Sequence, residues 1–182
     1  ELLCHALLNE EKESEDSPFF DGDNVEKYIV AHLSNHLIRA RTYQKASDMI
    51  LDKKFIQRRI KALGTLEATH HQMSDLVEFR KEYNRVHGKS ENSANAGDAS
   101  EATPKQKSLD AGKVVREGSR RIVTAIRAIE SKDSDAGGSV DVAVCIATVG
   151  DHLLKARQTK ESISRLEEAT VLFRDIFGSY NE

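Results

Sequence analysis

The chain has 182 residues, of which 38% are hydrophobic and 31% are charged, and its formal net charge is -3. Only 2 prolines and 5% aromatic residues argue against a β-sandwich or barrel, and no alternating run is long enough to build a sheet. The charge balance gives no sign of a nucleic acid or an anionic membrane as partner. No apolar run approaches the ~20 residues that span a bilayer. We therefore expect an all-α protein with a thin core and a well-solvated surface.

The first residues, 1–23, are expected to hold the end of a helix and then a loop. Pro18 and Gly22 both oppose helix formation, which predicts the loop. Asp23 or Asn24 is placed to cap the helix that follows. Because the chain starts at Glu1 and not at a methionine, we interpret it as a segment of a longer protein.

Four helix-period patterns follow and predict a helical bundle over residues 24–87. Apolar residues recur at three- and four-residue steps, which places Tyr28, Leu33 and Leu37 on one face of the first helix. Gly64 ends the third pattern, as glycine often does at a helix C-terminus. Short connections predict antiparallel neighbours. The expected helices are 25–41, 43–51, 53–63 and a long helix that Thr65 caps and His87 ends.

The stretch 28–79 has a recognisable order of residue types. An aromatic residue is followed by two HL pairs, a small residue, an alanine in the second helix, an apolar pair with aspartate, another aromatic and a late glycine. These positions are held by Tyr28, His32, Leu33, His36, Leu37, Ala40, Ala46, Ile50, Leu51, Asp52, Phe55 and Gly64. The order resembles the helical segment of STAND-type signalling NTPases (the NB-ARC and NACHT proteins), which lies between the nucleotide-binding module and the sensor repeats. Arg41 departs from it, because the family usually has a glycine or small residue after the first helix.

The composition changes at residues 88–107, which are rich in Ser, Ala, Asn and Glu and carry no large apolar side chain. Such a segment cannot bury enough surface to offset its ordering entropy, so we expect a disordered linker. Residues 108–182 return to helical periodicity. The expected helices are 108–131, 140–157 and 159–177.

The last helix pair resembles a tetratricopeptide repeat of the kinesin-light-chain-like form. The positions that carry the resemblance are Asp141, Val142, Ala143, Ile146, Val149, Gly150, Leu153, Ser162, Leu166, Ala169, Leu172, Ile176, Phe177 and Gly178. Gly150 is expected where two helices cross closely and only a small residue fits. The resemblance implies antiparallel helix hairpins in a right-handed superhelical array, in which each repeat stacks on the next. Residues 108–131 are then the second half of a degenerate preceding repeat.

Two groups of polar residues are candidates for chemistry. His32 and His36 are four residues apart and share a helix face, as in zinc-binding helices, and His70 or His71 is a candidate third ligand. No glutamate follows His32 to act as a base, so packing of both rings is the favoured interpretation, and no metal or cofactor is predicted. A basic run is expected to form a solvated face, or else to meet an acidic protein surface. Its members are Lys53, Lys54, Arg58, Arg59 and Lys61.

No phosphate loop is present in the sequence, so a nucleotide-binding module of a STAND parent would lie upstream of Glu1. Cys145 is close to Asp151 and His152, but we interpret it as a small buried side chain. Cys4 and Cys145 lack CxxC spacing, which indicates reduced thiols and a cytoplasmic location.

These observations predict a non-catalytic protein-interaction and regulatory segment. It would couple an upstream signalling NTPase to downstream tetratricopeptide repeats that bind protein or peptide partners. The alternatives are a kinesin-light-chain-like adaptor without an NTPase, and a metalloprotein with zinc at His32 and His36. The residues expected to carry the structure are Tyr28, Leu33, Leu37, Phe55, Ile146, Val149, Gly150, Leu153, Leu166 and Ala169.

Overall fold

The computed structural model describes residues 22–88, 109–133 and 140–178, and within these ranges the chain forms seven α-helices and no strand. The all-α class is therefore confirmed for this part of the chain. Expectations for residues 1–21, for Cys4 and for nearly all of the linker fall outside it, and the superhelical array stays a prediction. The helices are α2 (Gly22–Arg39), α3 (Tyr43–Leu51), α4 (Lys53–Leu63), α5 (Thr65–His87), α6 (Ala111–Asp133), α7 (Val140–Lys155) and α8 (Thr159–Gly178).

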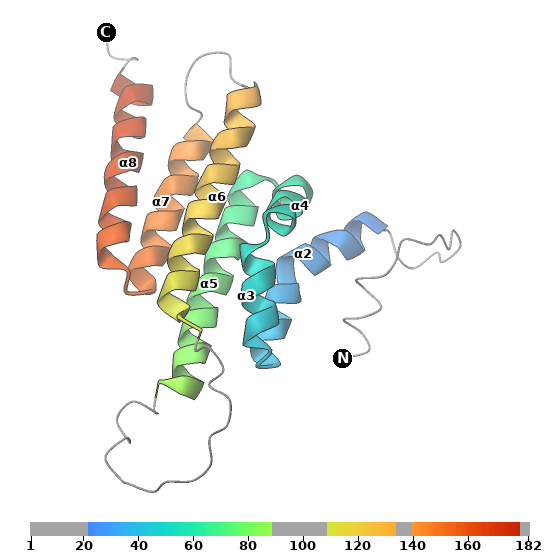
Figure 1. Cartoon of the computed structure of the whole chain (residues 1–182). Coiled ribbons are helices and arrows are strands. Elements are labelled where there is room, and N and C mark those ends of the chain that lie inside the picture. The colour runs from blue at the N-terminus through green and yellow to red at the C-terminus, as the bar shows by residue number, and fades with distance from the viewer. Residues whose placement is uncertain (1–21, 89–108, 134–139, 179–182) are drawn as a thin grey trace, which may run out of the picture.

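Helix α5 is the centre of the arrangement (Figure 1). It packs against α2, α3 and α4 and also against α6 and α7, whereas α8 packs on α7. One continuous hydrophobic core includes Ile50 of α3, Leu76 and Phe79 of α5, Val115 of α6 and Ile146 of α7. The helices before and after residues 89–108 therefore share one core.

The break between α3 and α4 follows from one residue. The carboxylate of Asp52 accepts hydrogen bonds from the backbone N–H groups of Lys54 and Phe55, both at 3.2 Å, so Asp52 ends α3 and caps α4. The next boundary differs from the expectation. Gly64, with φ of 81°, occupies the N-cap position of α5, and Thr65 lies inside the helix.

Helix α2 begins earlier than its sequence pattern suggests. It starts at Gly22, so Asp23 and Asn24 lie within its first turn and do not precede the helix. An acidic side chain in a first turn interacts favourably with the helix dipole, which explains why Asp23 fits there as well as at a cap.

The turn after α2 shows what the departure at Arg41 does to the backbone. The N–H of Arg41 donates to the carbonyl of Ile38 at 3.0 Å, and the N–H of Thr42 donates to that of Leu37 at 3.1 Å. This is the Schellman pattern, in which the residue with positive φ is usually glycine. Arg41 adopts it with φ of 58°, and Arg157 has φ of 53° in the turn between α7 and α8. A non-glycine residue in this conformation costs about 1 kcal/mol.

Two glycines allow helices to approach closely. A Cβ atom added at Gly150 of α7 would lie 2.8 Å from the side chain of Leu166 on α8. A Cβ atom at Gly118 of α6 would lie 2.7 Å from the Cδ2 atom of Leu76 on α5. Both distances are too short for a real contact, so these crossings depend on the missing side chain.

Candidate functional site: a buried arginine network beside a histidine-lined groove

Arg59 is the largest fully buried side chain of the described residues, with 0% exposure. It lies on α4 between Ile56 and Ile60, which are themselves buried, so the helical period turns it toward α2 and α5. Its Cζ atom lies 4.8 Å from the centre of the Phe55 ring, which covers one face of the guanidinium.

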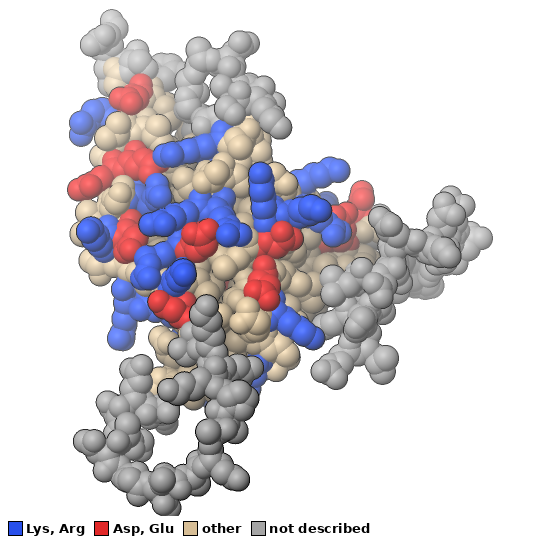
Figure 2. Space-filling model, viewed as in Figure 1, with Lys and Arg blue, Asp and Glu red and all other residues tan. Residues whose placement is uncertain are grey.

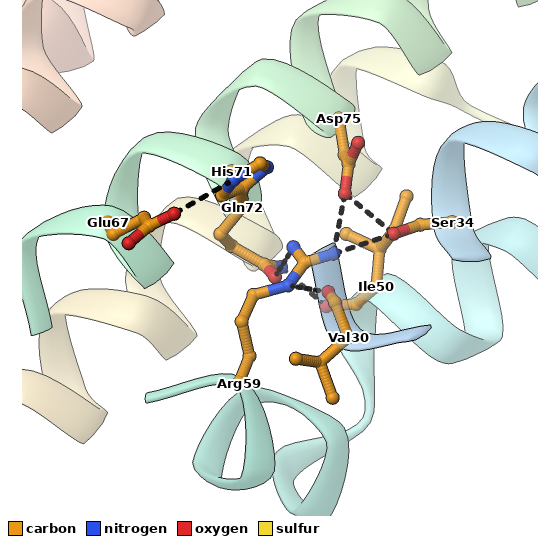
Figure 3. A network of polar contacts seen from close by, with 8 residues as sticks. All are labelled: Val30, Ser34, Ile50, Arg59, Glu67, His71, Gln72 and Asp75. Carbon is orange, nitrogen blue, oxygen red and sulfur yellow. Dashed lines mark hydrogen bonds and ion pairs between the residues drawn. The ribbon is translucent and has the colours of Figure 1, made fainter. Parts of the chain in front are cut away.

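Four of the five N–H donors of this guanidinium have partners (Figure 3). The Nε atom donates to the carbonyl of Val30 at 2.6 Å, and Nη1 donates to Oε1 of Gln72 at 2.8 Å. The Nη2 atom donates to Oγ of Ser34 and to Oδ2 of Asp75, both at 2.8 Å. Asp75 is 4% exposed, so the ion pair is shielded from solvent.

The partners are joined to one another as well. The hydroxyl of Ser34 donates to Oδ2 of Asp75 at 2.6 Å, and Nε2 of Gln72 donates to the carbonyl of Ile50 at 2.7 Å. The network therefore connects α2, α3, α4 and α5 through a single charged side chain. A buried network of this kind fixes the relative positions of its helices when every member has a partner.

This finding corrects the expectation for the basic run on α4. The sequence pattern predicts a solvated face for Arg59, but its side chain lies in the core. Burial lowers the pKa of Arg59 from its usual value, and the carboxylate of Asp75 opposes that change. The signal was present in the sequence, because position 59 is three residues after Ile56 and four before Leu63, on the apolar face of α4.

A row of aromatic and imidazole rings runs across the surface beside this network. Its first part lies on α2, where the hydroxyl of Tyr28 is 3.2 Å from Nε2 of His36 and the Tyr28 ring is 4.8 Å from that of His32. The ring of His32 then meets that of His71 on α5, edge to face, with 5.8 Å between centres. The α2 histidines therefore make packing contacts, which is the interpretation favoured from the sequence.

The row continues onto α7. The rings of His70 and His71 have centres 6.3 Å apart, and His70 meets His152 at 5.2 Å. His152 is 7% exposed, and its Nδ1 atom lies 2.9 Å from the carbonyl oxygen of Thr148. Sequence spacing gave no sign of this contact between α5 and α7. Within the described ranges, no group of three or more His, Cys, Asp or Glu side chains is placed to hold a metal ion.

The fold is expected to lose stability as the pH falls below about 7.5 because of two histidines. Burial, followed by the charge of Arg59, lowers the pKa of His71, and burial lowers the pKa of His152 although the Thr148 carbonyl opposes this. A histidine whose pKa is lower in the folded chain binds fewer protons there, so stability decreases as the pH falls through its ordinary value of 6.5. Thermal unfolding of the variant with His71→Gln and His152→Gln should show a smaller pH dependence.

The matched control is His36→Gln, because His36 is exposed and contacts Tyr28 rather than His71 or His152. It should keep more of the wild-type pH dependence than the double variant. Equal slopes for all three proteins would show that His71 and His152 do not titrate differently on folding.

Two adjoining hollows form a groove along the first half of α5, which we call the α5 groove. The smaller has a volume of about 350 Å³ and the larger of about 860 Å³, and they share Leu63, Glu67 and His71. The smaller is lined further by Lys27, Tyr28, Ala31, His32 and Ala62. The larger is lined further by Gly64, Thr65, Leu66, His70, Asp141 and Thr148.

The residues expected to carry the structure fall into three groups. Tyr28 and Leu166 are exposed by 58% and 38%, and Phe55 is half-buried beneath Arg59. Gly150 lies at the close crossing of α7 and α8. The buried members are Leu33, Leu37, Ile146, Val149, Leu153 and Ala169. Cys145 is also buried, as expected, and burial raises the pKa of its thiol.

Arginines on α5 and α6 reach across to neighbouring helices. Arg80 donates to the carbonyl of Ala156 in the turn before α8, and Arg121 donates to the carbonyl of Leu51 at the end of α3.

Figure 2 shows Lys and Arg interspersed with Asp and Glu on the face formed by α6 and α8. None of the described helices is both long and apolar enough to cross a membrane.

Comparison with known proteins bears on the first part of the chain. The family model of the APAF-1 helical domain matches residues 7–98, a range that includes α2 to α5. This domain is the helical segment that follows NB-ARC in STAND proteins, so that part of the resemblance is confirmed. The tetratricopeptide resemblance of the last helix pair stays a prediction. No curated protein and no solved structure matches the chain.

Proposed function

Because the chain belongs to the APAF-1 helical domain family, we propose that it couples an upstream signalling NTPase to downstream helical repeats as a regulatory segment without catalysis of its own. The observation that carries this proposal is the position of α5 between the two halves of the chain. The family match includes α5, and α5 also packs against α6 and α7, outside the matched range. A displacement of α2 to α5 therefore has a packed route to the later helices.

A polar contact supports the same route at the far end of α5. Arg80 is half-buried and donates to the carbonyl of Ala156, just before the positive-φ residue Arg157 in the turn between α7 and α8. A displacement of α5 from this turn that exceeds the reach of the arginine side chain would break the bond. The contact therefore joins the position of α8 to that of α5.

Exposed apolar side chains on α8 are a further argument for downstream repeats. Helix α8 packs on α7, while Ile163 and Phe177 are exposed by 52% and 53%. Exposed apolar side chains that follow a helical period are what a stacking helix of a further repeat would cover. Such repeats would bind protein or peptide partners, and the buried thiol of Cys145 is compatible with a cytoplasmic location.

The test uses the parent protein with a nucleotide-binding module ahead of this segment. Hydrogen exchange is measured in the ADP-bound and ATP-bound forms. We expect amide protection to change in α8 as well as in α2 to α5. A change confined to α2 to α5, or none in either region, would contradict coupling, and further repeats upstream in place of a nucleotide module would favour the adaptor alternative.

Arg80→Gln gives a matched variant for the coupling route. It should keep the nucleotide-dependent change in α2 to α5 and reduce the change in α8, because the link to Ala156 is lost. Lys81→Gln is the control, since Lys81 is exposed and its ion pair is with Glu78 on the same helix. The same loss in both variants would argue against a specific role for Arg80.

A further inference from the structure

The larger hollow of the α5 groove combines an apolar wall with negative charge. Leu63 and Leu66 form the wall, and Leu66 is 47% exposed. Glu67 and Asp141 line the same hollow, and no lysine or arginine of the described residues does. Glu67 has a 62% exposed side chain and lies 3.7 Å from His71. The Glu67 side chain is therefore reachable from solvent.

Helix stability alone accounts for only part of this arrangement. Glu67 and Asp141 each lie in the first turn of a helix, where an acidic side chain is favourable. That explains each residue type but not why both acidic residues line one hollow beside exposed apolar side chains. Val140, next to Asp141, is also 42% exposed. Single exposed apolar residues are common, whereas a concave site with convergent charge is what a binding surface requires.

We propose that the larger hollow of the α5 groove docks an amphipathic segment of a partner protein that presents a leucine-sized side chain beside lysine or arginine. The apolar side chain would enter the larger hollow between Leu63 and Leu66. The cationic group would then reach Glu67 or Asp141 at the rim. The volume of about 860 Å³ accommodates several side chains, which suits a helix laid in a groove. Charge complementarity selects the basic class of segment.

This docking site is independent of the proposed coupling function. None of its residues lies on α8, and binding to it needs neither a nucleotide nor further repeats. A nucleotide experiment that contradicts coupling would not count against docking at the groove. A peptide experiment that contradicts docking would not count against the coupling proposal.

The test uses the full 182-residue chain and two fluorescent peptides of about four helical turns. Both peptides share one leucine pattern, and their polar positions carry lysine in one and glutamate in the other. Fluorescence anisotropy should show the lysine peptide binding at least about tenfold more tightly. Equal affinities would overturn the proposal.

Charge reversal in the groove separates docking from general attraction. The variant with Glu67→Lys and Asp141→Lys should weaken binding of the lysine peptide by about tenfold. The control variant with Asp48→Lys and Glu167→Lys has the same net charge, but both positions are exposed and lie on α3 and α8. Its affinity should stay near that of the wild type. Equal weakening by the two variants would show that net charge drives binding, and the proposal would fail.

Leu66→Ser tests the apolar wall without changing charge. Because Leu66 is nearly half exposed, the substitution should leave the thermal unfolding midpoint close to that of the wild type. It should weaken binding of the lysine peptide by several-fold. Unchanged affinity in this variant would overturn the assignment of the hollow as the apolar subsite.

Discussion

Arg59→Met is expected to lower the free energy of unfolding by about 3–5 kcal/mol. The substitution keeps most of the side-chain volume but removes the charge that faces Asp75 at 2.8 Å. Asp75 would then be a buried carboxylate with only the hydroxyl of Ser34 as a partner in the network. The acceptors on Val30 and Gln72 would lose their donor as well. Urea unfolding followed by circular dichroism measures the change.

Arg58→Met is the matched control, because it makes the same substitution one position earlier on α4. The side chain of Arg58 is 66% exposed, and its ion pair with Glu26 is long, at 3.4 Å. Exposed pairs of this kind contribute about 0–1 kcal/mol, so the free energy of unfolding should change little. A similar cost for both variants would mean that burial of Arg59 does not determine its contribution.

A double variant distinguishes the charge pair from simple packing. When Arg59→Met is combined with Asp75→Leu, no unpaired charge remains, and much of the lost stability should return. Greater instability in the double variant than in Arg59→Met would show that the two residues contribute independently. Coupling between them is therefore measurable as a double-mutant cycle.

The sequence was sufficient for local features of the fold. Aspartate is a favoured N-cap residue, and Asp52 stands between two apolar patterns. The boundary between α3 and α4 could therefore be predicted. Gly64 likewise marked the end of α4. Such boundaries depend on residues within a few positions of one another, and a single sequence contains that information.

Contacts between distant helices were not predictable in the same way. Arg59 is buried because α2 and α5 meet over one face of α4, and its partner Asp75 lies on another helix. The row of rings joins His32 on α2 to His152 on α7 through α5, although the three helices are far apart in the chain. The one local sign of a buried ion pair is a charged residue at a position where the helical period expects an apolar one. A solvated run of basic residues shows the same local pattern, so the sequence alone does not distinguish the two.

Leu76→Ala is expected to lower the free energy of unfolding by about 2–5 kcal/mol and to loosen both halves of the chain together. Leu76 is fully buried on α5, and its methyl groups fill the space over Gly118 on α6. Removing them leaves a cavity at the crossing through which α6 is joined to the core. Because helices on both sides of α5 share that core, hydrogen exchange should accelerate in α2 to α4 and in α6 to α8.

Leu154→Ala is the control for this substitution, since Leu154 is 53% exposed on α7 and its truncation should change stability by about 0.5 kcal/mol or less. Adding Gly118→Ala to Leu76→Ala should restore part of the loss, because the new methyl group occupies space that Leu76 leaves. Faster exchange in α6 to α8 with α2 to α4 unchanged would mean two units that unfold separately. The shared core would then be too weak to transmit a displacement through α5, and the proposed coupling would lose its physical basis.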